Sequence, residues 1–166
     1  MGFELKRLPR TSLDAAIAKA EHYRDLNQPE EAESICRDVL DLDATNARAW
    51  KLLGLALTDR FASAHVGLLE QAIDAFERLP DAYERTYHLG VAWERAAKAH
   101  TERGEAHSAV TSFEHALGLF EKAEKMHPDS PDPVLRWNRC VRLLTTHPLL
   151  RAAVAAPRES ETLLGD

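Results

Sequence analysis

Apolar residues recur along most of this chain at intervals of three or four positions, as Ala32, Cys36 and Val39 do. Such spacing places apolar side chains on one face of an α-helix. The pattern predicts seven helices and a short eighth, at about residues 12–26, 29–42, 47–60, 65–78, 82–103, 106–126 and 132–146, with the short one near 149–155.

Polar residues mark the points where several of these helices begin. Asn46 and Asp81 precede two predicted helices, and their short side chains can accept hydrogen bonds from the first free amides. Asp132 precedes Pro133, and proline suits the first helical turn because it has no N–H to leave unpaired. These signals predict N-caps at Asn46, Asp81 and Asp132.

The composition favours an all-α fold. Ala occurs 26 times and Leu 23 times in 166 residues, whereas Val and Ile together occur ten times. Ala and Leu are strong helix formers, and β-branched residues are the ones enriched in strands. A chain of this length is expected to form one domain with a real core.

Charge and hydropathy exclude several functional classes. The net charge is −6 with neutral histidines, and no basic block occurs, which argues against partners that are nucleic acids or anionic membranes. No apolar run approaches the roughly 18 residues of a spanning helix, and the segment that begins the sequence has no apolar signal region. Two cysteines are too few for a disulfide framework, so we expect a cytoplasmic protein.

A motif recurs along the chain. Leu53-Gly54 and Leu89-Gly90 lie 36 residues apart, and Ala44 and Pro80 keep the same spacing. A third copy ends at Pro128. Repeats of this period are typical of stacked helical hairpins.

The third copy is longer than the others. Pro80 and Pro128 lie 48 residues apart, 12 more than the earlier period. Twelve residues correspond to about three helical turns. We therefore expect one hairpin with longer helices that turns near Gly104.

The residues of this motif resemble the tetratricopeptide repeat. Trp50-x-x-Leu53-Gly54 matches its first helix, and small residues alternate with large ones that include Trp93 and Phe120. The resemblance implies a right-handed solenoid of about three antiparallel hairpins plus a capping helix at 132–146. It also implies an N-terminal extension at 1–11, a repeat domain at 12–146, and a partly disordered C-terminal tail at 147–166.

Proteins similar to this family bind peptides or other proteins in a concave groove formed by the first helix of each pair. The resemblance therefore implies a non-catalytic interaction module with no cofactor. Carried over residue by residue, it implies a partner-binding groove formed by Arg48, Lys51, Leu52, Leu55, Glu84, Tyr87, His88, Val91 and Arg95. The ligand would be a protein or peptide.

Two other functions stay open at this point. One is self-association into a homodimer through the groove or an end of the solenoid. The other is a metal protein or enzyme that uses His88, or the pair His100 and His107 that flanks Gly104. No set of three ligands shares one face, so we expect no metal site. No nucleophile motif occurs either, so we expect no catalytic residues.

Three further features have simple expectations. Cys36 and Cys140 occupy apolar helix positions and are expected to be buried structural thiols. Arg136, Arg139 and Arg142 are spaced by three and predict a positive stripe on the last long helix. This stripe, which Arg151 and Arg158 extend, is either a solvated face or a docking patch for an acidic partner.

Overall fold

The protein is all-helical, as the sequence predicts. A computed structural model describes residues 2–63 and 67–157. Over these ranges it has no strand and contains two short 3-10 helices, Arg10–Ser12 and Phe61–Ser63. Its eight α-helices are α1 (Leu13–Asp25), α2 (Pro29–Leu42), α3 (Ala47–Asp59), α4 (Leu68–Glu77), α5 (Ala82–Glu102), α6 (Ala106–Met126), α7 (Asp132–Thr146) and α8 (Pro148–Ala155).

The predicted N-caps are confirmed for two of three helices. The Asn46 side chain accepts from the amide of Ala49 at 3.0 Å, and the Asp81 side chain accepts from Glu84 at 2.8 Å. The prediction for Asp132 is wrong, because Asp132 is already the first residue of α7 and its side chain makes no cap bond. Its carboxylate instead lies at the positive end of the helix dipole.

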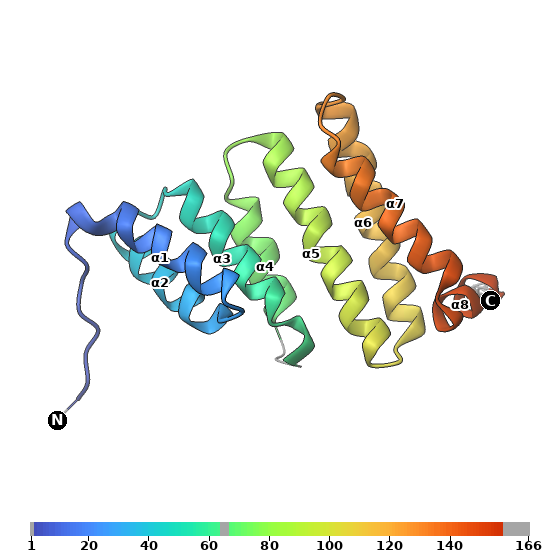
Figure 1. Ribbon diagram of the computed structural model, residues 1–166, viewed down its shortest axis with the longest axis horizontal. Helices are drawn as coiled ribbons and strands as arrows, with labels where there is room; N and C mark the ends of the chain where they lie inside the picture. Colours follow the sequence, from blue (N-terminus) through green and yellow to red (C-terminus); the bar gives the residue numbers. More distant parts are fainter. Residues whose placement is uncertain (1, 64–66, 158–166) are drawn as a thin grey trace, which may run out of the picture.

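The helices follow one another along the long axis of the molecule (Figure 1). Consecutive helices run antiparallel, and each packs against the helices before and after it in the sequence. The first helix of each hairpin (α1, α3 and α5) and then α7 form a row in chain order, and we call the side of the molecule that they form the first-helix face.

Glycines let the two helices of a hairpin approach closely. A Cβ built on Gly54 of α3 would overlap the ring of Phe76 in α4, and one built on Gly90 of α5 would lie 2.6 Å from Phe120 Cε1 in α6. Both rings are fully buried. The same kind of contact therefore joins the two helices within each of two successive hairpins.

The tryptophans have a different role from the one the repeat pattern implies. Trp50 and Trp93 are half-buried rather than packed beside the glycines. Trp50 donates its indole N–H to the Ala44 carbonyl at 2.8 Å, and Arg78 lies over its ring at 4.5 Å. Phe76 and Phe120, which belong to the second helix of each hairpin, fill the space at the glycines instead.

The third hairpin is the longest, as its repeat spacing predicts. α5 and α6 each have 21 residues, against 13 in α3 and 10 in α4. Gly104 turns the chain between them at φ 76°, a left-handed conformation that suits glycine. The end of α5 consequently extends beyond the start of α4.

The packed helices continue beyond residue 146, where the sequence pattern places the end of the repeat domain. α8 packs against α6 and α7, and Leu150 is fully buried. The expected tail therefore contributes a helix to the core up to Ala155, and the part of it from residue 158 onward lies outside the described residues. Among the described helices, none combines the length and apolar character needed to cross a bilayer.

The glycine contacts predict a paired mutational result. Gly90→Ala should lower the free energy of unfolding by about 1–3 kcal/mol, because the added methyl overlaps a fixed aromatic ring. Gly118→Ala is the matched control, since Gly118 lies in α6 with open space at its Cβ. It should stabilise the protein by about 0.5–1 kcal/mol through helix propensity. Chemical denaturation of both variants measures this difference, and equal effects would contradict the contact.

Candidate functional site

Two cations of the predicted groove form ion pairs with neighbouring helices of the first-helix face. Arg48 of α3 pairs with Glu21 of α1 at 3.2 Å, and Lys51 of α3 pairs with Glu84 of α5 at 3.3 Å. Each pair links two neighbouring helices of the first-helix face, so these side chains join the helices to one another as well as lining the face. About half of each side chain remains exposed, which limits the contribution of each pair to stability.

A more buried network holds α1, α3 and α5 together. Asp59, at the end of α3, pairs with Arg24 of α1 at 2.6 Å and also with Arg95 of α5. Arg95 donates to the Thr58 hydroxyl at 2.7 Å as well. Burial lowers the pKa of Arg95, and the charge of Asp59 opposes that effect. Arg95 is therefore primarily a structural cation.

The predicted apolar strip of the groove is not available to a partner. Leu52 is 6% exposed and Val91 is 1% exposed. Leu55 is half-buried and packs against both of the hydrophobic clusters that make up the core. The prediction that Leu52 and Val91 line an accessible groove does not agree with this burial, because Leu52 belongs to the hydrophobic cluster of α1 to α5 and Val91 to the cluster of α5 to α8.

His88 is also buried, whereas the groove prediction exposes it. Its ring is 9% exposed and lies against Phe76 and Tyr87, with centroid distances of 5.3 and 5.1 Å. Its Nδ1–H donates to the Glu84 carbonyl at 2.7 Å. Burial lowers the pKa of His88, while the contacts with Glu84 act in the opposite direction. A neutral, hydrogen-bonded core histidine fits this environment.

Glu94 of α5 is a fully buried carboxylate surrounded by cations. Arg136 of α7 binds it at 2.8 Å, Lys98 lies at 3.2 Å, and Arg139 lies at 4.0 Å. Arg136 also donates to the Tyr87 hydroxyl at 3.3 Å. This cluster joins α5 to α7, and sequence reasoning did not predict its ion pairs. A signal was present, since Glu94 is an acidic residue within the apolar stretch from Val91 to Ala97.

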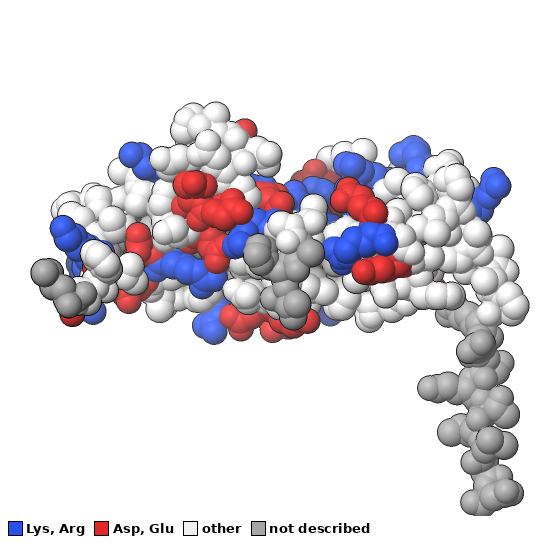
Figure 2. All heavy atoms as spheres, turned by 90° about the horizontal axis from the view of Figure 1, so that it is seen from below, with Lys and Arg blue, Asp and Glu red and all other residues white. Residues whose placement is uncertain are grey.

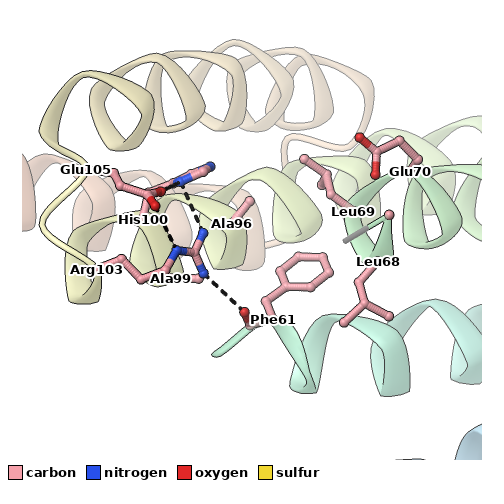
Figure 3. A pocket seen from close by; sticks show the side chains of 10 residues that line it. Phe61, Leu68, Leu69, Glu70, Ala96, Ala99, His100, Arg103 and Glu105 are labelled. Atoms are coloured by element: carbon pink, nitrogen blue, oxygen red, sulfur yellow. Dashed lines mark hydrogen bonds and ion pairs between the residues drawn. The ribbon is translucent and has the colours of Figure 1, made fainter. Parts of the chain in front are cut away.

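A hollow lies between the end of α5 and the start of α4 (Figure 3). It has a volume of about 430 Å³. Its apolar wall comes from the second 3-10 helix, α4 and α5, and consists of Phe61, Leu68, Leu69, Ala96 and Ala99. The hollow forms where the longer α5 extends past α4. Repeat spacing predicted the length of α5, but it did not predict the hollow.

Charged groups form the rim of this hollow on the α5 side. His100 donates to the carboxylate of Glu105, and Arg103 donates to the same carboxylate at 3.1 Å (Figure 3). Arg103 also reaches the Phe61 carbonyl at 3.4 Å and so bridges the two walls. These bonds from His100 and Arg103 lower the pKa of Glu105. An apolar wall beside a charged rim is typical of sites that bind one side chain of a partner.

The structure does not bring His100 and His107 together. His100 lines the hollow of Figure 3, whereas His107 lines a second hollow of about 670 Å³ between α6 and α8. Within residues 2–63 and 67–157, no three His, Cys, Asp or Glu side chains are grouped as a metal site requires.

The cysteines are buried, as predicted. Cys36 and Cys140 are free thiols with at most 1% exposure. Burial raises the pKa of each thiol to about 12. Neither is a reactive thiolate at neutral pH, because nucleophilic thiols require a lowered pKa and access to solvent.

Charges of both signs are interspersed on the face that carries the ends of α1, α3 and α5 (Figure 2). Arg60, next to the end of α3, illustrates the pattern, because it pairs with both Glu33 and Glu30 of α2. In the predicted arginine stripe, Arg136 is drawn to Glu94 while Arg139 and Arg142 stay exposed. Arg158 lies outside the described residues.

A scan against protein-family models and a search of curated proteins found no match to this chain.

The Asp59 network predicts a large difference between two carboxylate deletions. Asp59→Ala should lower the free energy of unfolding by about 1–3 kcal/mol, because it leaves two partly buried arginines unpaired. Asp74→Ala removes an exposed pair with Arg78 and should cost no more than about 0.5 kcal/mol. Urea denaturation of both variants measures this, and similar losses would show that Asp59 is only a surface charge.

His88 predicts a pH-dependent contribution to stability. Its pKa in the folded protein is below the ordinary value of 6.5, so the unfolded chain binds more protons as the pH falls below that value. His88 should therefore make wild type lose stability between about pH 7 and pH 5. His88→Leu should show a shallower loss over this range in urea denaturation at each pH. Parallel stability curves for the two proteins would contradict this assignment.

Proposed function

We propose that this chain is a non-catalytic interaction module that binds a segment of a partner protein. In this proposal its hairpins form a right-handed solenoid of the tetratricopeptide type, with α7 as the first capping helix. The observation that supports it best is the repeated glycine–phenylalanine contact in two successive hairpins. A contact that recurs with the hairpins is expected where each repeat buries its apolar face only against its neighbours.

The surface we assign to the partner differs from the groove that the sequence implies. The first-helix face is largely engaged in its own ion pairs, and its apolar residues are core. The hollow of Figure 3 instead has an apolar wall in which Leu69 of α4 is half-buried, while Ala96 and Ala99 of α5 lie behind it at 5% exposure each. We assign it to one bulky apolar side chain of the partner.

The expected affinity is moderate. Most binding energy in an interface comes from a few anchoring side chains, and one hollow supplies one anchor. A disordered partner segment also loses conformational freedom on binding. The module would act as a scaffold in the cytoplasm, where the free thiols Cys36 and Cys140 remain reduced.

Self-association is the second candidate, because the extended segment before α1 exposes large apolar side chains. Phe3 and Leu5 have relative exposures of 107% and 95%, and they alternate with polar residues. Such a segment can contact a second copy of the chain, and homodimers are the commonest oligomers.

A larger side chain in the hollow of Figure 3 should prevent the apolar side chain of the partner from binding there. Ala99→Leu adds carbon atoms at the wall of the hollow of Figure 3 without introducing charge, and an unchanged urea midpoint is the check that this buried position accepts them. Selection of a displayed random-peptide library on immobilised wild type should enrich a bulky apolar residue, and selection on Ala99→Leu should lose that enrichment. The physical reason is steric, since both groups need the same space.

Ala153→Leu is the matched control for this selection, because Ala153 lines the other hollow, beside α8. It should enrich the same peptides as wild type. Failure of wild type to enrich any peptide would contradict the proposed function. Light scattering of the same preparations would favour self-association if it showed a dimer that dissociates on dilution.

A further inference from the structure

We propose that the partner segment is an acidic peptide and that its carboxylates bind Lys98, Arg139 and Arg142 between α5 and α7. We call these three residues the α5–α7 cations. The inference rests on the proposed function, because it names the chemistry of the segment that the module binds.

The cations around Glu94 outnumber the carboxylates that can balance them. Arg136, Lys98 and Arg139 all approach the carboxylate of Glu94, which is itself fully buried. Arg136 makes the shortest pair and uses Oε2, whereas Lys98 and Arg139 both approach Oε1. One negative charge therefore lies among three positive ones, and like charges this close repel one another.

All three cations keep part of their side chain exposed, and for Arg136 that part is 28%. Arg139 has 62% of its side chain exposed and stands at the limiting distance of 4.0 Å from Glu94. Lys98 has 28% of its side chain exposed. Arg142 is exposed three residues beyond Arg139, and the described part of the chain gives it no ion pair. Residues three apart share a helix face, so Arg139 and Arg142 extend one positive surface.

An incoming carboxylate would reduce this imbalance. It can accept hydrogen bonds from Arg139 and Lys98 while Glu94 keeps Arg136 as its close partner. Charge-assisted bonds between arginine and carboxylate are short, directional and about twice as strong as neutral ones. The positive surface also contrasts with the net charge of −6 of the whole chain, so an acidic segment is attracted here and repelled elsewhere.

A shallow hollow beside Arg139 indicates which way the peptide runs along α7. It is lined by Tyr87, Asp132, Leu135, Arg136 and Arg139, and Leu135 is 62% exposed. Asp132 lies about 15 Å along α7 from Arg142, and its carboxylate disfavours acidic groups at that end. We therefore place the acidic residues of the peptide toward Arg142 and away from Asp132.

A peptide fits this surface better than a nucleic acid does. The α5–α7 cations form a single small group, and an acidic residue, Asp132, lies in the hollow beside Arg139. A phosphate backbone needs a longer positive track, because its affinity comes from many phosphate contacts together.

Selection of a displayed random-peptide library on the full chain tests the inference directly. Peptides enriched on wild type should be rich in Asp and Glu, and the enrichment should disappear on the double variant Lys98→Ala/Arg139→Ala. This variant leaves Glu94 paired with Arg136. For an enriched peptide, fluorescence anisotropy should show binding about tenfold weaker to the double variant. Added salt should weaken binding to wild type as well.

Two further variants separate recognition from folding. Arg142→Ala removes an exposed cation without an ion pair, so it should weaken binding while leaving the urea midpoint unchanged. Lys125→Ala removes an exposed lysine of α6 and should change neither, because its pair with Glu121 is a surface pair.

The outcomes of this selection distinguish the two proposals. Enriched peptides that are basic or uncharged would overturn the acidic partner and leave the interaction module intact. No enrichment on wild type would count against the module itself. Binding of a single-stranded oligonucleotide that is lost with the α5–α7 cations, in the absence of acidic peptides, would assign this surface to nucleic acid instead.

Discussion

The fold depends on the close approach of two helices at a glycine. Gly54 and Gly90 lack the one carbon atom that would collide with the rings of Phe76 and Phe120. Each ring therefore packs directly against the backbone of the preceding helix at its glycine, and this contact sets the distance between the two helices of the hairpin. The ion pairs of the first-helix face then join one hairpin to the next, since they link α1 to α3 and α3 to α5.

Local signals in the sequence predicted the helices well because those signals are physical causes of helix ends. Asn46 and Asp81 accept hydrogen bonds from free amides wherever the chain goes next. Repeat spacing also predicted that α5 and α6 are long, and the extra turns produced the hollow of Figure 3. The length of these two helices thus had a structural consequence whose position periodicity alone did not indicate.

The candidate site was harder to predict because it depends on contacts between residues distant in sequence. Leu52 and Val91 looked available on single helices, and they are buried because several other helices pack around each of them. The ion pairs of Asp59 and Glu94 were not predicted, since their arginine partners lie far away in the chain. Helical periodicity identifies a helix face, whereas the tertiary arrangement determines what covers it.

Leu55 has a consequence for how the molecule unfolds. The core consists of two hydrophobic clusters, one toward each end of the chain, and Leu55 is a partly buried residue that packs against both. In an elongated array, cooperativity passes only between neighbouring units. Contacts at this junction therefore couple two folding units, and loosening them would let one end open while the other stays native.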